Sequence, residues 1–290
     1  MKKVLKIYLL IASWLVLYSF GMSSYENIKA NNNAKKFMDK GMLVEVDLEN
    51  RITYYEVENE NYKNEYRPFF DDDRERLGMP GDILLTTGSN FPENKLIDWF
   101  VGYYFGKHAA LVLDNGDYAE VGAGIDEAID ILDFCLWPRD KENISGTGPE
   151  IYRERWIDAN CYKPTSDYYQ YYHGFDFDES YGMRIKGITD EERKMVSDIA
   201  REIIDENPMY NYLFFINKTN GVYCTSFIKN AYERLGDKTG KYYNTDYDGF
   251  TITVNDIILA RDTYMFYYFY VDDKGMGHFY YLKGEKVWIG

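Results

Sequence analysis

Short apolar runs along the chain predict a small antiparallel sheet. Residues 83–85, 109–113 and 118–121 are runs of mostly apolar side chains, which are typical of buried strands. Gly81 stands before the first run as a turn residue, and the sequence Asp-Asn-Gly at 114–116 separates the other two. We therefore expect the second and third runs to form a hairpin.

Apolar positions spaced three or four residues apart predict two helices. The first is expected to begin at Thr189, which can form a capping box with Glu192, and to end before Pro208. The second is expected to follow Cys224 and to end at Gly236. Together with the short strands, these helices predict an α+β fold.

The first segment of the chain has the layout of an export signal. The lysines within the first six residues precede sixteen uncharged and mostly apolar residues, 7–22, as in secretory signals. Cleavage after Ser23 would release the rest of the chain, whereas an uncleaved segment approaches the length that crosses a bilayer. We predict that residues 1–23 are a signal peptide or a membrane anchor and that the remainder is exported.

Composition argues against two kinds of partner. The chain has 33 basic and 48 acidic residues, a formal net charge of −15, and it lacks a basic stripe beyond its first residues, so we expect no nucleic-acid partner. His, Cys and Asp residues do not cluster at ligand spacing along the sequence, so we predict no metal site and no cofactor. The 30 tyrosines are either ordinary core and surface residues or the lining of a groove for sugar or peptide.

Three cysteines are an odd number for an exported chain, which leaves one thiol without a disulfide partner. Cys135 lies in an apolar run and Cys161 in a polar stretch, and the two either pair with each other or remain separate buried thiols. Cys224 stands at the expected start of a helix, where free N–H groups and the helix dipole favour a thiolate. It is either a reactive nucleophile or a small apolar residue before a helix.

A nucleophilic thiol needs a base, and the chain offers three histidines. His173 lies in an aromatic loop, as exposed histidines often do. His278 follows Cys224 by 54 residues, but its segment predicts a hairpin. His108 opens an apolar strand, and Glu120, a carboxylate inside a second apolar strand, follows twelve residues later. We therefore favour His108 as the base.

The turn between these strands decides whether Glu120 can orient His108. With a two-residue turn, Glu120 would oppose Leu111 and lie on the opposite face from His108. With a three-residue turn that ends at a left-handed Gly116, Glu120 opposes Ala110 and lies diagonal to His108 on one face.

Cys224, His108 and Glu120 would together supply a nucleophile, a base and an orienting carboxylate, which is the arrangement that activates a thiol for acyl transfer. We expect the side chains of His108 and Glu120 to point toward the N-terminus of the helix at Cys224. The alternative is that the three are unrelated structural residues.

Six short motifs occur in order along the chain: 81–84 (Gly-Asp-Ile-Leu), 107–112 (Lys-His-Ala-Ala-Leu-Val), 118–120 (Tyr-Ala-Glu), 208–211 (Pro-Met-Tyr-Asn), 223–227 (Tyr-Cys-Thr-Ser-Phe) and 253–257 (Thr-Val-Asn-Asp-Ile). Over about residues 80–264 the chain thereby resembles the circularly permuted branch of the NlpC-type papain-like hydrolases, the YiiX/YaeF-like family. In that branch His and Glu precede Cys, as they do here. Family members often have Ser before the histidine and Ser-Glu after the cysteine, where this chain has Lys107 and Thr225-Ser226.

The resemblance implies a permuted papain-like fold, in which an antiparallel sheet packs against helices that include the nucleophile helix. It assigns Cys224 as nucleophile, His108 as base and Glu120 as the third polar residue. We expect 24–77 to be an N-terminal extension with a hairpin, 78–265 to be the catalytic domain, and 266–290 to be a C-terminal β-hairpin.

The expected activity is that of an exported cysteine peptidase or amidase that cleaves an amide through a thioester on Cys224. Export would place it beside cell-wall peptide, so peptide or peptidoglycan is the expected substrate. One alternative is a lipid or acyl-ester hydrolase or acyltransferase on the same fold, held near the bilayer by its anchor. Another is a wall-binding module without catalysis, in which tyrosines stack on the ligand.

Overall fold

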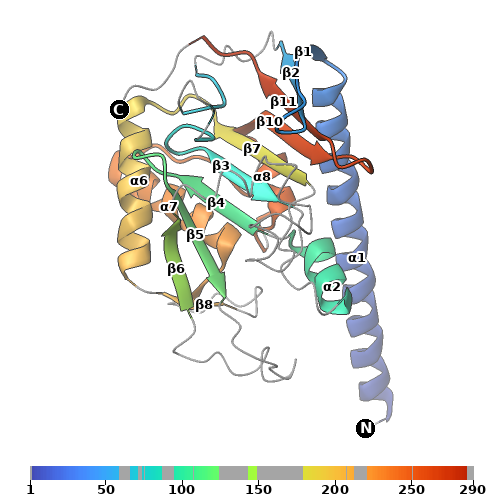
Figure 1. The fold of residues 1–290 in the computed structure, drawn as a ribbon. Helices are drawn as coiled ribbons and strands as arrows, with labels where there is room; N and C mark the ends of the chain where they lie inside the picture. Colours follow the sequence, from blue (N-terminus) through green and yellow to red (C-terminus); the bar gives the residue numbers. More distant parts are fainter. Residues whose placement is uncertain are drawn as a thin grey trace.

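In the computed structural model, the described part of the chain forms a nine-stranded sheet flanked by helices (Figure 1). The structure describes residues 2–58, 66–70, 74, 76–86, 95–106, 108–123, 143–148, 179–206, 208–211, 221–249 and 251–285. The strand order is β1-β2-β11-β10-β7-β3-β4-β5-β6. Neighbouring strands are antiparallel except β2 and β11. The predicted α+β class is confirmed.

The elements have the following bounds: α1 Lys2–Met38, β1 Gly41–Asp47, β2 Ile52–Val57, β3 Ile83–Thr86, α2 Lys95–Tyr104, β4 His108–Val112, β5 Tyr118–Ala123, β6 Asn143–Gly148, β7 Glu179–Ile185, α6 Asp190–Asp205, β8 Met209–Tyr210, β9 Gly221–Val222, α7 Cys224–Thr239, α8 Val254–Leu259, β10 Thr263–Val271 and β11 Gly277–Leu282. Strands β8 and β9 form a separate parallel pair directly before α7.

Helix α1 is one continuous rod with two different halves. Large apolar side chains of its first half are exposed, and this helix is apolar and long enough to cross a membrane. In its second half Ser23, Glu26, Ala30 and Ala34, spaced three or four residues apart, are buried against the domain. The helix therefore continues through the cleavage position expected at Ser23 and connects the apolar segment directly to the folded domain (Figure 1).

Both predicted hairpins outside the central region are present, and they belong to the same sheet. Strands β1 and β2 form the hairpin of the N-terminal extension, and β10 and β11 form the C-terminal hairpin, with Gly275 at a φ of 70° in its turn. Strand β2 pairs in parallel with β11 over its whole length, from Ile52 opposite Gly277 to Val57 opposite Leu282. The sheet thus runs through the extension, the central region and the C-terminal hairpin.

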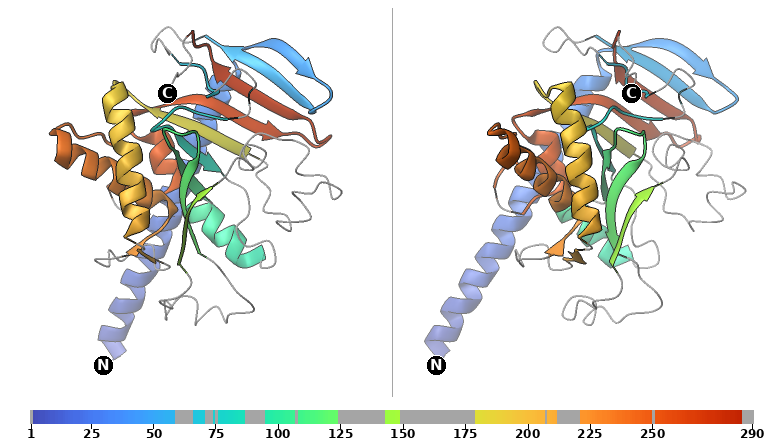
Figure 2. Two further views of the ribbon diagram at one scale, coloured as in Figure 1. Left: turned by 60° about the vertical axis from the view of Figure 1, so that its left-hand side comes forward. Right: turned by 90° about the vertical axis from the view of Figure 1, so that its left-hand side faces the viewer.

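The two faces of the sheet are buried by different elements, because alternate residues of a strand point to opposite sides. On the first face, Ala109 and Leu111 of β4 pack with α6, α7, α8 and the second half of α1. On the second face, Ala110 and Val112 pack with Leu77 and with aromatic residues of β2, β10 and β11. We call these the helix face and the aromatic face. Figure 2 shows α6 and α7 together on one side of β4 and β5.

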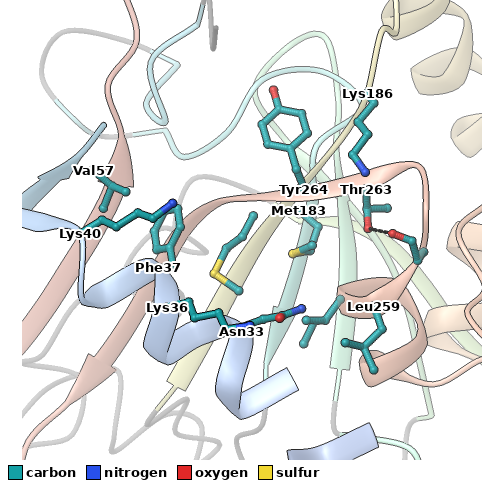
Figure 3. Close-up of a pocket in the computed structure, with 13 residues that line it drawn as sticks. Asn33, Lys36, Phe37, Lys40, Val57, Met183, Lys186, Leu259, Thr263 and Tyr264 are labelled. Carbon is teal, nitrogen blue, oxygen red and sulfur yellow. Dashed lines mark hydrogen bonds between the residues drawn. The ribbon is translucent and has the colours of Figure 1, made fainter. Parts of the chain in front are cut away.

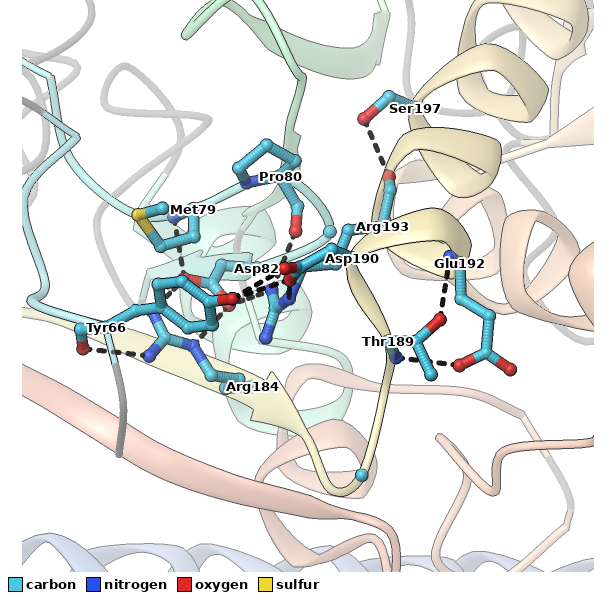
Figure 4. A network of polar contacts seen from close by, with 12 residues as sticks. Tyr66, Met79, Pro80, Asp82, Arg184, Thr189, Asp190, Glu192, Arg193 and Ser197 are labelled. Atoms are coloured by element: carbon cyan, nitrogen blue, oxygen red, sulfur yellow. Dashed lines mark hydrogen bonds and ion pairs between the residues drawn. The ribbon is translucent and has the colours of Figure 1, made fainter. Parts of the chain in front are cut away.

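The Asp of the Gly-Asp-Ile-Leu motif lies in a buried charge network (Figure 4). The Nε of Arg184 donates to Oδ1 of Asp82 at 2.7 Å and its Nη2 donates to Oδ2 at 2.5 Å. The backbone N–H of Met79 also donates to Asp82, and Arg193 donates to the carbonyl of Pro80. Asp82 therefore neutralises a buried guanidinium and holds the turn that leads into β3.

The two predicted helices begin where expected, but one of them ends later. Helix α6 has the predicted capping box between Thr189 and Glu192. Helix α7 begins at Cys224 but continues past Gly236 to Thr239, and Gly240, at a φ of 74°, is its left-handed C-cap. A Cβ on Gly236 would lie 2.3 Å from the ring of Tyr242, so that glycine makes room for an aromatic ring and does not stop the helix.

Four features singled out in the sequence lie outside the described residues: Cys135, Cys161, His173 and Lys107.

Candidate active site

The turn between β4 and β5 has three residues, as the pairing of Glu120 with His108 requires. Gly116 has a φ of 81°, and Glu120 lies opposite Ala110. The Nε2 of His108 and Oε2 of Glu120 are 2.8 Å apart. The expected three-residue register and the side-chain pair that depends on it are confirmed.

The His108–Glu120 pair is shielded from water, since the side chains are 8% and 14% exposed. A carboxylate bonded to Nε2 fixes the orientation of the imidazole and stabilises its protonated form. Because Glu120 engages Nε2, His108 would exchange a proton with a thiol through Nδ1. The pair is thus suited to general-base chemistry.

Cys224 is the first residue of α7 and is buried, at 8% exposed. The N-cap is Tyr223, whose backbone is extended and whose N–H donates to Oγ of Ser226 at 2.8 Å. The N–H groups in the first turn of a helix are free of intrahelical partners. This end of α7 therefore suits a group that carries negative charge during a reaction.

Cys224 and His108 lie at the same end of the sheet. Tyr232 lies eight residues after Cys224 in α7, and its hydroxyl donates to the carbonyl of Gly81. The N–H of Gly81 in turn donates to the carbonyl of Val112, the last residue of β4. Eight helical residues advance by about 12 Å, and the four strand residues from Val112 back to His108 span about 13 Å. Cys224 is therefore level with His108.

The alternation of side chains along β4 and β5 assigns the thiol and the pair to different faces of the sheet. Cys224 packs in the helix-face cluster with Ala109. His108 and Glu120 alternate with the helix-face residues and share the side of Ala110 and Tyr118, which belong to the aromatic face. Among the described residues no hydrogen bond joins the sulfur of Cys224 to His108. The structure brings the base and the carboxylate together, and the orientation of both side chains toward the start of α7 stays a prediction.

His278 lies much farther from Cys224 along the sheet. Strands β10, β7 and β3 separate β11 from β4, a distance of about 19 Å at four steps of 4.8 Å. Its Nε2 lies 3.1 Å from Oδ2 of Asp272, and its ring stacks on Tyr55 and Tyr270. Of the two described histidines, His108 is the better placed to serve Cys224.

A cavity of about 370 Å³ opens between α1, α8 and β10 (Figure 3). The ammonium groups of Lys36, Lys40 and Lys186 surround apolar side chains such as Phe37 and Met183. The described residues that line it include no thiol, imidazole or carboxylate. The cavity therefore offers binding groups but no nucleophile or base.

A second polar cluster was missed by the sequence analysis. Glu26 comes together with Asp248 and Asp256 although it lies far from both in the sequence. A signal for one of them exists, because Glu26 shares a helical face with Ser23, Ala30 and Ala34 and is the charged member of that face.

Searches with this chain found no matching family model, no matching curated protein and no matching solved structure.

Proposed function

We propose that this chain is a membrane-anchored cysteine hydrolase with a permuted papain-like fold. The observation that carries the proposal is the 2.8 Å contact between Nε2 of His108 and Oε2 of Glu120. A buried imidazole held by a carboxylate is the arrangement that general-base catalysis uses. The helix that packs on the same strand begins with Cys224, a free thiol.

In the proposed reaction, His108 takes the thiol proton of Cys224 as the sulfur attacks the carbonyl carbon of an amide. The C–N bond breaks, and the imidazolium gives the proton to the leaving amine. A water molecule, deprotonated by His108, then attacks the thioester and releases the acid and the thiol. Glu120 stabilises the imidazolium in both steps, and N–H groups at the start of α7 are suited to hold the oxyanion.

This chemistry requires His108 to reach the helix face. His108 forms the last pair of its ladder, with Thr86, and it follows closely after Gly106, which has a φ of 73°. A shift of one residue at the entry to a strand moves a side chain to the other face. We propose that His108, as the end residue of β4, turns so that Nδ1 reaches Cys224 around the strand end while Nε2 keeps its contact with Glu120.

The proposed substrate is an amide in cell-wall peptide, with the domain held outside the cytoplasm by α1. The exposed apolar face of α2 favours a second candidate, an acyl-ester hydrolase or acyltransferase that acts on lipid. Leu96, Trp99 and Phe100 are exposed on α2, and this helix contacts α1 through Tyr103, whose ring stacks on Phe20 with centroids 5.1 Å apart. Such a face beside an apolar helix suits a membrane surface.

The test is mass spectrometry of the full chain after treatment with an activity-based thiol probe. We expect the probe to modify Cys224 in preference to Cys135 and Cys161. His108→Ala should slow modification and turnover about a hundredfold or more, because a general base is lost, whereas the matched control His278→Ala should leave both nearly unchanged.

Equal labelling of all three thiols, or of none, contradicts the proposal, and so does a dead His278→Ala beside an active His108→Ala. Product analysis separates the two substrates, since an amide releases an amine and a lipid ester releases a fatty acid. If Cys224→Ala keeps wall binding and no activity is lost, the chain is instead a non-catalytic binding module.

A further inference from the structure

Three carboxylates from two distant parts of the sequence meet where α1 packs against α8. Glu26 comes from the second half of α1, Asp256 from α8, and Asp248 from the loop that precedes α8. One carboxylate oxygen of each lies within 4.8 Å of an oxygen of the other two.

Two of these carboxylates are buried and incompletely satisfied. Glu26 is 5% exposed and Asp256 is 1% exposed. Oε1 of Glu26 and Oδ1 of Asp256 are inaccessible to solvent and accept no hydrogen bond from the described residues. In contrast, Oδ2 of Asp256 accepts from both N–H and Oγ1 of Thr253, at 2.8 and 2.7 Å. A buried carboxylate oxygen without a partner is costly, so these two oxygens point to a missing positive group.

The neighbouring lysines are already engaged. Lys229 donates to Oδ2 of Asp246 at 2.8 Å, and Lys29 donates to the hydroxyl of Tyr247 at 2.7 Å. Neither ammonium group contacts Oε1 of Glu26 or Oδ1 of Asp256, which have no hydrogen-bond partner among the described residues.

We propose that Glu26, Asp248 and Asp256 bind a calcium ion that fastens α1 to the domain. Calcium lies 2.3–2.6 Å from its oxygen ligands, so oxygens on opposite sides of the ion are about 4.6–5.2 Å apart. The three carboxylate oxygens lie within 4.8 Å of one another, so a single ion at these distances can contact all three. Magnesium usually keeps several water ligands and binds through one or two carboxylates, whereas calcium accepts more carboxylate ligands.

The site joins the rod that carries the apolar segment to the body of the protein. Glu26 lies four residues beyond the apolar stretch that ends at Met22, and Asp256 is held in place by the capping box of α8. A site with three carboxylates, one of them exposed, corresponds to the weaker calcium sites of extracellular modules, with dissociation constants of about 0.1–1 mM.

The experiment is calorimetric titration of the full chain in detergent with calcium chloride, together with thermal unfolding with and without calcium. We expect one bound ion and an unfolding temperature that rises with calcium, because the ion binds the folded state. Glu26→Gln should weaken calcium binding at least tenfold and abolish the rise.

The calcium-free unfolding temperature of Glu26→Gln should be no lower than that of the wild type, because the amide removes a repulsive charge without removing side-chain volume. Asp248→Asn, at an exposed position, should weaken binding in the same way without disturbing the cap of α8. The matched control is Glu191→Gln, an exposed glutamate on α6, which should bind calcium like the wild type. No calcium binding by the wild type, or wild-type binding by Glu26→Gln, would overturn the proposal.

Discussion

At the scale of single residues, Asp82 shows how a motif residue acts through structure alone. It is completely buried beside Arg184, which is 1% exposed, and it makes two hydrogen bonds to that guanidinium. A buried charge that loses its partner is strongly destabilising, whereas a pair replaced by apolar residues is often tolerated.

We therefore predict that Asp82→Ala lowers the free energy of unfolding by about 3–5 kcal/mol, because it removes the carboxylate that neutralises the buried guanidinium of Arg184. The double variant Asp82→Ala/Arg184→Met should recover a large part of this loss. Both values can be measured by chemical denaturation of the full chain in detergent. A loss below about 1 kcal/mol for the single variant would show that water compensates the guanidinium.

The same scale shows what the sequence could and could not predict about the site. The His108–Glu120 contact follows from the length of one turn and the alternation of two strands, which are local properties. The meeting of Glu26 with Asp248 and Asp256 depends on how α1 docks against α8. More than 220 residues separate Glu26 from Asp248 and Asp256 in the chain, so no rule of ligand spacing could predict their contact. The sequence therefore led to the expectation of no metal site.

At the scale of elements, the decisive feature is the entry to β4. The starts of α6 and α7 could be predicted because a helix cap is determined by a few adjacent residues. Whether the side chain of His108 shares a face of the sheet with α7 depends instead on which face α7 packs against. That is decided by tertiary packing and not by adjacent residues. Gly236 is a second example. A glycine is needed there because the ring of Tyr242 packs against it, and the spacing of apolar residues along a helix does not predict such a contact.

The proposed movement at the entry to β4 predicts a disulfide. If residue 108 swings toward α7, then His108→Cys should cross-link to Cys224 under mild oxidation, because a disulfide requires Cα atoms about 4.4–6.8 Å apart. The bond can be detected by mass spectrometry of peptides from the non-reduced chain. His278→Cys is the control and should not cross-link to Cys224. If neither variant forms the bond, residue 108 stays on the aromatic face and the triad is not assembled.

At the scale of the whole molecule, the proposed membrane anchoring by α1 also places α2 relative to the bilayer. The first half of α1 is apolar and exposed, and Asn27 of its second half donates to the carbonyl of Tyr103 at 3.0 Å, which fixes α2 against the rod. The exposed side chains of Leu96 and Trp99 on α2 would then lie in the interfacial layer of the bilayer.

We predict that Trp99 contacts lipid in the full-length protein. In vesicles that contain brominated lipid, the quenched fraction of tryptophan fluorescence should fall in Trp99→Phe, because a lipid-exposed emitter is removed. Trp14→Phe, in the apolar half of α1, is the positive control and should also lower it. An increase in the quenched fraction for Trp99→Phe would mean that this side chain lies in water and that α2 stands clear of the membrane.

The parallel pairing of β2 with β11 has a consequence for the time course of folding. Ile52 lies opposite Gly277, so 225 residues must be synthesised after the first strand of this pair before the second exists. At about 5–20 residues per second, this takes about 10–45 s. During that interval one edge of β2 has no permanent partner, and unpaired edges invite aggregation. The β1–β2 hairpin, which follows α1, is thus synthesised early but gains its last neighbour late, and the pairing of the C-terminal strand β11 completes the sheet.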